Sequence, residues 1–169
     1  VKVYAEHHED GEPEGDPGVV GGPADARAPT ASVFKVVSAA ALLAGDVDVN
    51  DRICFHGGRN GIREENLRDH RRDRRCESLA TSVAHSTNAA IAKWAATRLD
   101  EGALANTAED FHFNRKLPFD VDLDVSPAPR PDSLLARGTL AAGFERGARL
   151  SPLHGAAIAA AIANGGLLM

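Results

Sequence analysis

A serine and a lysine stand three residues apart at the start of an apolar stretch, Val33 to Ala44. If this stretch is one helix, Ser32 and Lys35 share a face, with Cβ atoms about 5–6 Å apart. A serine hydroxyl is a weak nucleophile until a base removes its proton. A lysine on so apolar a helix is desolvated, which lowers its pKa and lets the neutral amine act as that base. The pair therefore indicates acyl transfer through a serine ester.

A second pair of polar side chains, Ser86 and Asn88, opens another helical pattern that continues to Leu99. A hydroxyl and an amide in this spacing can relay a proton and hold the amide group of a substrate beside the nucleophile. Each pair also has a purely structural interpretation. Serine and asparagine are favoured helix caps, and a lysine can extend its apolar stem along a helix while its amine stays in water.

A third segment lies near the end of the chain. It begins Ser151-Pro152-Leu153 and continues through an alanine-rich run to Asn164-Gly165-Gly166. Serine followed by proline is a typical helix start, because proline suits the first helical position.

The order of these three segments resembles the transpeptidase domain of penicillin-binding proteins, the serine enzymes that cross-link peptidoglycan. That family has Ser-x-Phe-Lys, then Ser-x-Asn, then Ser/Thr-Pro-Leu leading to Asn-Gly-Gly, and the resemblance covers the chain from Val1 to Met169. The family's third motif, Lys-Thr/Ser-Gly, follows Asn-Gly-Gly, and the sequence ends before it. We therefore expect a single partial transpeptidase domain, with an N-terminal strand and loop over 1–31 and a catalytic helical region over 32–169.

The resemblance implies a D,D-transpeptidase in which Ser32 attacks D-Ala-D-Ala stem peptides of peptidoglycan, and in which β-lactams acylate the same serine. Lys35, Ser86 and Asn88 would complete the site, with no cofactor and no metal. Without the third motif, the 169-residue piece is expected to be inactive by itself. Two alternatives remain: a β-lactamase-like or penicillin-sensing relative, and a non-catalytic module that keeps the fold.

The expected fold is mainly α with little strand, the helical part of the α+β fold that penicillin-binding proteins share with β-lactamases. Val1–Ala5 alternates like a strand, and an unpaired strand of this kind favours self-association. Helical patterns predict six helices, and three stretches are expected to be loops or extended connections: 7–27, 50–77 and 117–131. The predicted helices are Val33–Ala44, Ser78–Ala84, Asn88–Leu99, Glu101–Phe111, a short one capped by Asp132 that runs through Leu140, and one starting at Ser151.

An arginine-rich stretch, 68–75, raises the question of nucleic-acid binding. Aspartates interrupt it, no aromatic residue interleaves for base stacking, and the chain has a net charge of −5. A solvated loop with local ion pairs is the better interpretation.

The two cysteines, Cys54 and Cys76, lie close to His56 and His70. Two cysteines and two histidines can bind zinc, but their spacing matches no common zinc motif. The family resemblance implies an oxidising compartment outside the cytoplasmic membrane, which favours a Cys54–Cys76 disulfide. Free thiols remain a third possibility.

The resemblance also implies a periplasmic or otherwise extracytoplasmic protein, anchored to the cytoplasmic membrane by a segment outside this sequence. Within the sequence no apolar run approaches the roughly 18–20 residues that a membrane-spanning helix needs. No signal peptide opens it either.

Overall fold

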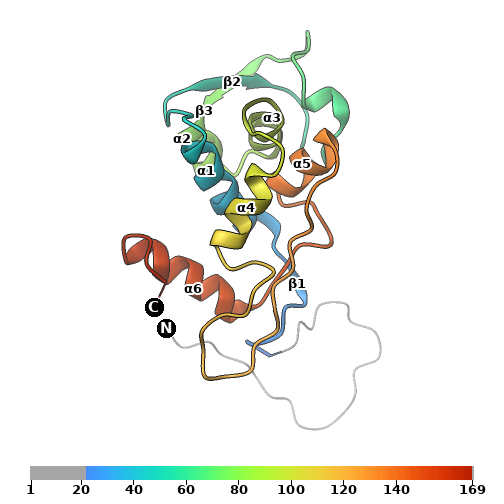
Figure 1. Ribbon diagram of the computed structural model, residues 1–169. Helices are drawn as coiled ribbons and strands as arrows, with labels where there is room; N and C mark the ends of the chain where they lie inside the picture. Colours follow the sequence, from blue (N-terminus) through green and yellow to red (C-terminus); the bar gives the residue numbers. More distant parts are fainter. Residues whose placement is uncertain (1–21, 169) are drawn as a thin grey trace.

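The computed structural model of the protein describes residues 22–168. The predicted strand Val1–Ala5 and most of the predicted loop 7–27 lie outside these residues. Figure 1 shows helices gathered around α3, with α6 set apart from them. The order is β1 (Ala28–Pro29), η1 (Ala31–Val33), α1 (Phe34–Ala44), β2 (Arg52–Phe55), η2 (Glu64–Asn66), β3 (Arg75–Ser78), α2 (Leu79–Ala84), α3 (Asn88–Arg98), α4 (Ala103–Asp110), α5 (Leu134–Ala141), β4 (Arg149–Leu150) and α6 (Pro152–Ala163).

The core forms where α3 packs against α1, α5, α2 and β2. Helix α3 is buried on nearly every face from Ala89 to Ala95, and Trp94 is fully enclosed. Helix α1 buries Phe34 and Leu42 against it and ends at Gly45. Because both central helices are surrounded by other elements, the polar groups at their N-termini have fixed positions.

The described residues contain two small antiparallel sheets, β1–β4 and β2–β3, each with two strands. The prediction of a mainly α chain with little strand is therefore confirmed for this part of the chain. The first sheet pairs Ala28 with Leu150 and Pro29 with Arg149. This pairing holds the segment before Ser32 against the segment before α6.

The hairpin β2–β3 corrects the prediction of a loop over 50–77. Arg52 pairs with Ser78 and Phe55 with Arg75. Each strand is only four residues long, and β3 has no buried residue. Neither strand therefore carries the alternation of apolar and polar residues from which strands are predicted.

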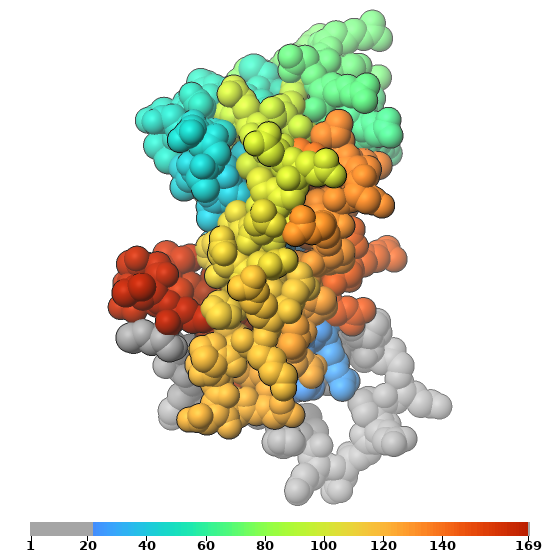
Figure 2. All heavy atoms as spheres, in the orientation of Figure 1, coloured from blue at the N-terminus to red at the C-terminus, as the bar shows by residue number. Residues whose placement is uncertain are grey.

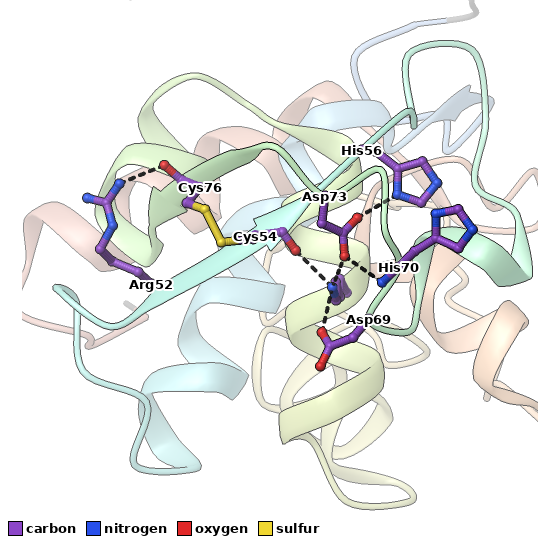
Figure 3. Close-up of a disulfide and its surroundings, with 8 residues drawn as sticks. Arg52, Cys54, His56, Asp69, His70, Asp73 and Cys76 are labelled. Carbon is purple, nitrogen blue, oxygen red and sulfur yellow. Dashed lines mark hydrogen bonds and ion pairs between the residues drawn. A yellow bond between two sulfur atoms is a disulfide. The ribbon is translucent and has the colours of Figure 1, made fainter.

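The cysteines form a disulfide across this hairpin, so the disulfide prediction is confirmed and the zinc and free-thiol alternatives are wrong. Cys54 and Cys76 face each other in the strand register, as Figure 3 shows. No group of three or more potential metal-ligating side chains occurs among residues 22–168. The bond closes the loop that joins the two strands.

Removal of this bond by the double substitution Cys54→Ser, Cys76→Ser is expected to lower the free energy of unfolding by about 3 kcal/mol. The two cysteines are 22 residues apart, and a cross-link over a loop of this size removes that much chain entropy from the unfolded state. Denaturant titration with and without reductant measures the effect. Reductant should destabilise the wild type by a similar amount and leave the double variant unchanged; equal stability of all four samples would contradict the prediction.

Helix starts agree with the sequence patterns in part. Helix α3 has Thr87 at its cap position, not Ser86 or Asn88, and α4 begins at Ala103, not Glu101. Ser151 caps α6 through a bond from the His154 N–H, with Pro152 at the first turn, as predicted. At α5 the cap is Ser133, whose hydroxyl accepts from the Ala136 N–H, and not Asp132. Both residue types cap helices, so the residue type alone could not place the boundary. Within the described range, every helix is too short or too polar to cross a lipid bilayer.

Candidate active site

The four residues singled out in the sequence come together at the N-terminal ends of α1 and α3. Ser32 lies in the short turn η1, Lys35 in the first turn of α1, and Asn88 at the start of α3. The Lys35 Nζ lies 3.2 Å from the Ser32 Oγ, 2.7 Å from the Ser86 Oγ and 2.5 Å from the Asn88 Oδ1. The Ser86 hydroxyl also donates to the Ser32 Oγ at 3.0 Å. Two motifs far apart in the sequence thus form one hydrogen-bonded group.

Lys35 is buried, with 3% of its surface exposed. Its amine contacts only neutral oxygens: two hydroxyls, the Asn88 amide oxygen and the Ser86 carbonyl at 2.8 Å. No carboxylate pairs with it among residues 22–168. Burial therefore lowers the pKa of Lys35 below its ordinary value, as the sequence predicted.

The oxygens around the Lys35 amine outnumber the N–H groups that an ammonium could donate to them, and this suits a neutral amine that acts as a base. Four acceptors surround the Nζ, while an ammonium has three N–H groups. The carbonyl and amide oxygens can only accept, but a hydroxyl can also donate. In the neutral amine, two N–H groups can serve the two obligate acceptors, and the lone pair is left for a hydroxyl proton. Ser32 is exposed, so its oxygen is open to a ligand.

A second buried lysine, Lys93 in α3, shows the opposite electrostatics. Its amine pairs with Asp73 at 2.7 Å and with Asp69 at 2.9 Å, and donates to the Cys54 carbonyl at 2.8 Å. Burial favours the neutral amine, but the two carboxylates outweigh it and raise the pKa of Lys93. The pKa of Lys93 is thus shifted upward by its carboxylate partners, whereas that of Lys35 is shifted downward by burial. This role of Lys93 could not be predicted from the sequence, because ion-pair partners from a distant loop leave no local pattern.

The substitution Lys93→Met is expected to lower the free energy of unfolding by about 3–5 kcal/mol, since it leaves the Asp73 carboxylate buried without its cation. Burial tends to raise the pKa of Asp73, but hydrogen bonds from Lys93, His56 and the His70 N–H lower it to about 2. The stabilisation that the Lys93–Asp73 pair provides is therefore present above pH 3.8, the ordinary pKa of an aspartate, and is lost as the pH falls toward 2.

Denaturant titrations at several pH values measure this loss, with Lys116→Met, a change at an exposed lysine, as the matched control. The difference between Lys93→Met and wild type should narrow in acid, while Lys116→Met stays close to wild type throughout. Equal effects of the two substitutions at neutral pH would contradict a stabilising ion pair.

Backbone conformation helps to place both serines. Ser86 has φ +53° and Ala31, next to Ser32, has φ +44°, both in the left-handed region. Gly143, after α5, lies against Ala31 so closely that a Cβ would stand 2.0 Å from the Ala31 carbonyl oxygen. Only glycine permits that approach. The role of Gly143 could not be predicted from the sequence, because a glycine after a helix predicts a helix end but not a contact with a turn more than a hundred residues earlier.

An apolar cavity of about 290 Å³ lies elsewhere, lined by the end of α4 and by α6 with residues such as Phe111, His154 and Ile158. None of the four site residues lines it. In the third sequence segment, the Ser151 hydroxyl accepts a hydrogen bond from the His154 N–H, and the His154 Nε2 lies 2.7 Å from the Phe111 carbonyl oxygen, so these contacts are structural.

Comparison with known proteins supports the same family as the sequence motifs. The family model described as the penicillin binding protein transpeptidase domain matches residues 10–169. Solved structures of penicillin-binding protein A from M. tuberculosis superpose with TM-scores of 0.70, 0.70 and 0.69 at 25%, 27% and 28% sequence identity. The first two are described as ceftriaxone and imipenem acyl-enzyme complexes. These matches cover 86% or 87% of the chain but only 34% to 36% of the solved chains. No curated protein matches the sequence.

Proposed function

Because the chain belongs to the family of penicillin binding protein transpeptidase domains, we propose that its natural protein is a peptidoglycan D,D-transpeptidase with Ser32 as the nucleophile. The observation that carries this proposal is the position of the Lys35 amine, within 3.2 Å of the Ser32 and Ser86 hydroxyls and of the Asn88 amide oxygen. A buried amine among neutral acceptors is a base, and an exposed hydroxyl beside it is a nucleophile.

In the first half of the reaction, the Ser32 Oγ forms a bond to the carbonyl carbon of the penultimate D-alanine, and its proton passes to the Lys35 Nζ. The bond from this carbon to the terminal D-alanine nitrogen then breaks. Ser86, whose hydroxyl contacts both the Lys35 amine and the Ser32 oxygen, returns the proton to the leaving amine. The products are free D-alanine and a Ser32 ester.

In the second half, an amine of a neighbouring stem peptide attacks the ester carbonyl. Lys35 accepts the proton of the amine, the new amide bond forms as the bond from the carbonyl carbon to the Ser32 Oγ breaks, and the proton passes from Lys35 to the Ser32 Oγ. A β-lactam would follow only the first half, since opening its ring acylates Ser32 without releasing a fragment. The acyl-enzyme descriptions of the M. tuberculosis relatives support this part of the proposal.

The proposed setting is periplasmic or extracytoplasmic, in a protein anchored to the cytoplasmic membrane. The Cys54–Cys76 disulfide supports an oxidising compartment. Peptidoglycan stem peptides are the proposed partners, and β-lactams the proposed inhibitors.

The experiment that tests the function supplies the natural protein with a stem peptide ending in D-Ala-D-Ala and an amine acceptor. We expect release of D-alanine, formation of the cross-linked product by mass spectrometry, and inhibition of both by penicillin. The lifetime of the penicillin adduct separates the alternatives. Rapid release of hydrolysed penicillin would indicate a β-lactamase, and an adduct without any release of D-alanine would indicate a penicillin-sensing protein.

A further inference from the structure

The loop between β2 and β3 reaches the candidate site at Gly58. Its carbonyl oxygen accepts a hydrogen bond from the Asn88 Nδ2 at 3.2 Å, while the Asn88 Oδ1 faces the Lys35 amine. The two ends of an amide differ: the nitrogen only donates and the oxygen only accepts. A carbonyl on one side of Asn88 and an amine on the other therefore select one of its two orientations.

Gly58 comes this close to α3 because it has no side chain. Its φ of +73° is in the left-handed region, and a Cβ would lie 2.5 Å from the Ala89 Cβ and 2.8 Å from the Ala89 nitrogen. Gly61, in the same loop, also has a positive φ, but no atom lies within 4 Å of its Cβ position. Both glycines have a φ that disfavours a side chain, +73° at Gly58 and +149° at Gly61, and only Gly58 has the close approach.

The loop is held to α3 by contacts that do not involve Asn88. Lys93 binds the Cys54 carbonyl on one stem of the loop and the Asp73 carboxylate on the other. The His56 Nδ1, two residues before Gly58, lies 2.6 Å from the Asp73 Oδ1. Figure 3 shows His56, Asp73 and the disulfide along this side of the hairpin, and Figure 2 shows the loop at one end of the molecule. Gly58 thus has a place fixed by the loop itself.

We propose that Gly58 is a positioning residue for the acyl-transfer site: its carbonyl orients the Asn88 amide so that the oxygen meets Lys35 and one N–H remains to donate to the acyl group of the substrate. This inference rests on the proposed function, because it assigns Asn88 a role in acylation. A glycine is required, since any larger residue moves the carbonyl away from α3.

The test is a double-mutant cycle on the natural protein, with the acylation rate by fluorescent penicillin as readout. Gly58→Ala is expected to slow acylation by about 10- to 100-fold, the range in which small misplacements near reacting groups fall. Gly61→Ala is the matched control and should acylate at close to the wild-type rate. In an Asn88→Ala background, Gly58→Ala should have little further effect, because the amide that it positions is gone.

An equal slowing by Gly58→Ala in both backgrounds would overturn the inference and leave the proposed function standing. A wild-type protein that forms no adduct at Ser32 would instead refute the proposed function.

If Gly58→Ala does not fold, a measurement on the wild-type protein still tests the inference. In ¹⁵N-labelled wild-type protein, one side-chain N–H proton of Asn88 should exchange slowly with solvent, assigned by its loss in Asn88→Ala. Rapid exchange of both protons would overturn the inference.

Discussion

Ser32→Ala is expected to abolish covalent labelling of the natural protein by fluorescent penicillin, because the substitution removes the oxygen that we propose to carry the acyl group. Folding should be little affected. Ser32 is exposed, and its side chain bonds only to Lys35 and Ser86 within the described chain. Labelling is read from gel fluorescence over time, and thermal unfolding is recorded on the same samples.

Ser133→Ala is the matched control, since it makes the same chemical change at an exposed helix cap away from the site. It should lose about 1 kcal/mol of stability and keep its labelling. Labelling of the Ser32→Ala protein at the wild-type rate would contradict the assignment of the nucleophile.

Lys35→Met is expected to slow acylation by about 10²–10⁴-fold, the contribution of a general base. Lys35→Arg should be equally slow, because a guanidinium stays protonated and cannot accept the proton of Ser32. In the wild type, acylation should rise with pH as Lys35 becomes neutral. Since burial lowers the pKa of Lys35, this rise lies below the pH at which an ordinary lysine titrates.

Stopped-flow acylation rates over a pH series measure both effects. The rise of the acylation rate with pH should be absent in Lys35→Met. An unchanged rise in that variant would show that a group other than Lys35 causes the pH dependence. The two lysine substitutions should also differ in their effect on stability. Lys35 has no carboxylate partner among residues 22–168, so Lys35→Met leaves no buried charge without its partner. It should therefore lose less stability than Lys93→Met.

The helices and the four site residues were predictable because their signals are local. Ser32 and Lys35 are three residues apart at the start of an apolar run, and this spacing predicts that they share a face even though Ser32 lies in η1 and Lys35 in α1. Asn88 opens α3 as its helical pattern predicts. The convergence of the two pairs came from the family resemblance, since no spacing within either motif relates α1 to α3.

What the sequence did not reveal depends on contacts between distant segments. The hairpin β2–β3 has strands too short and too polar for a periodic pattern, and it is held by a disulfide and by Lys93 from α3. Gly58 and Gly143 are ordinary loop glycines in the sequence. Their importance appears only when the backbones that they approach, at Ala89 and Ala31, are known. A local pattern contains no information on such approaches.

Peptide mapping by mass spectrometry after reaction with penicillin can show whether Ser32 carries the acyl group. The natural protein is treated with penicillin, digested, and searched for peptides that gain the mass of the intact antibiotic. We expect one modified peptide, with the added mass on Ser32 and at a stoichiometry of about one per chain. Modification of another serine, or an unmodified Ser32 in a protein that binds penicillin, would contradict this expectation.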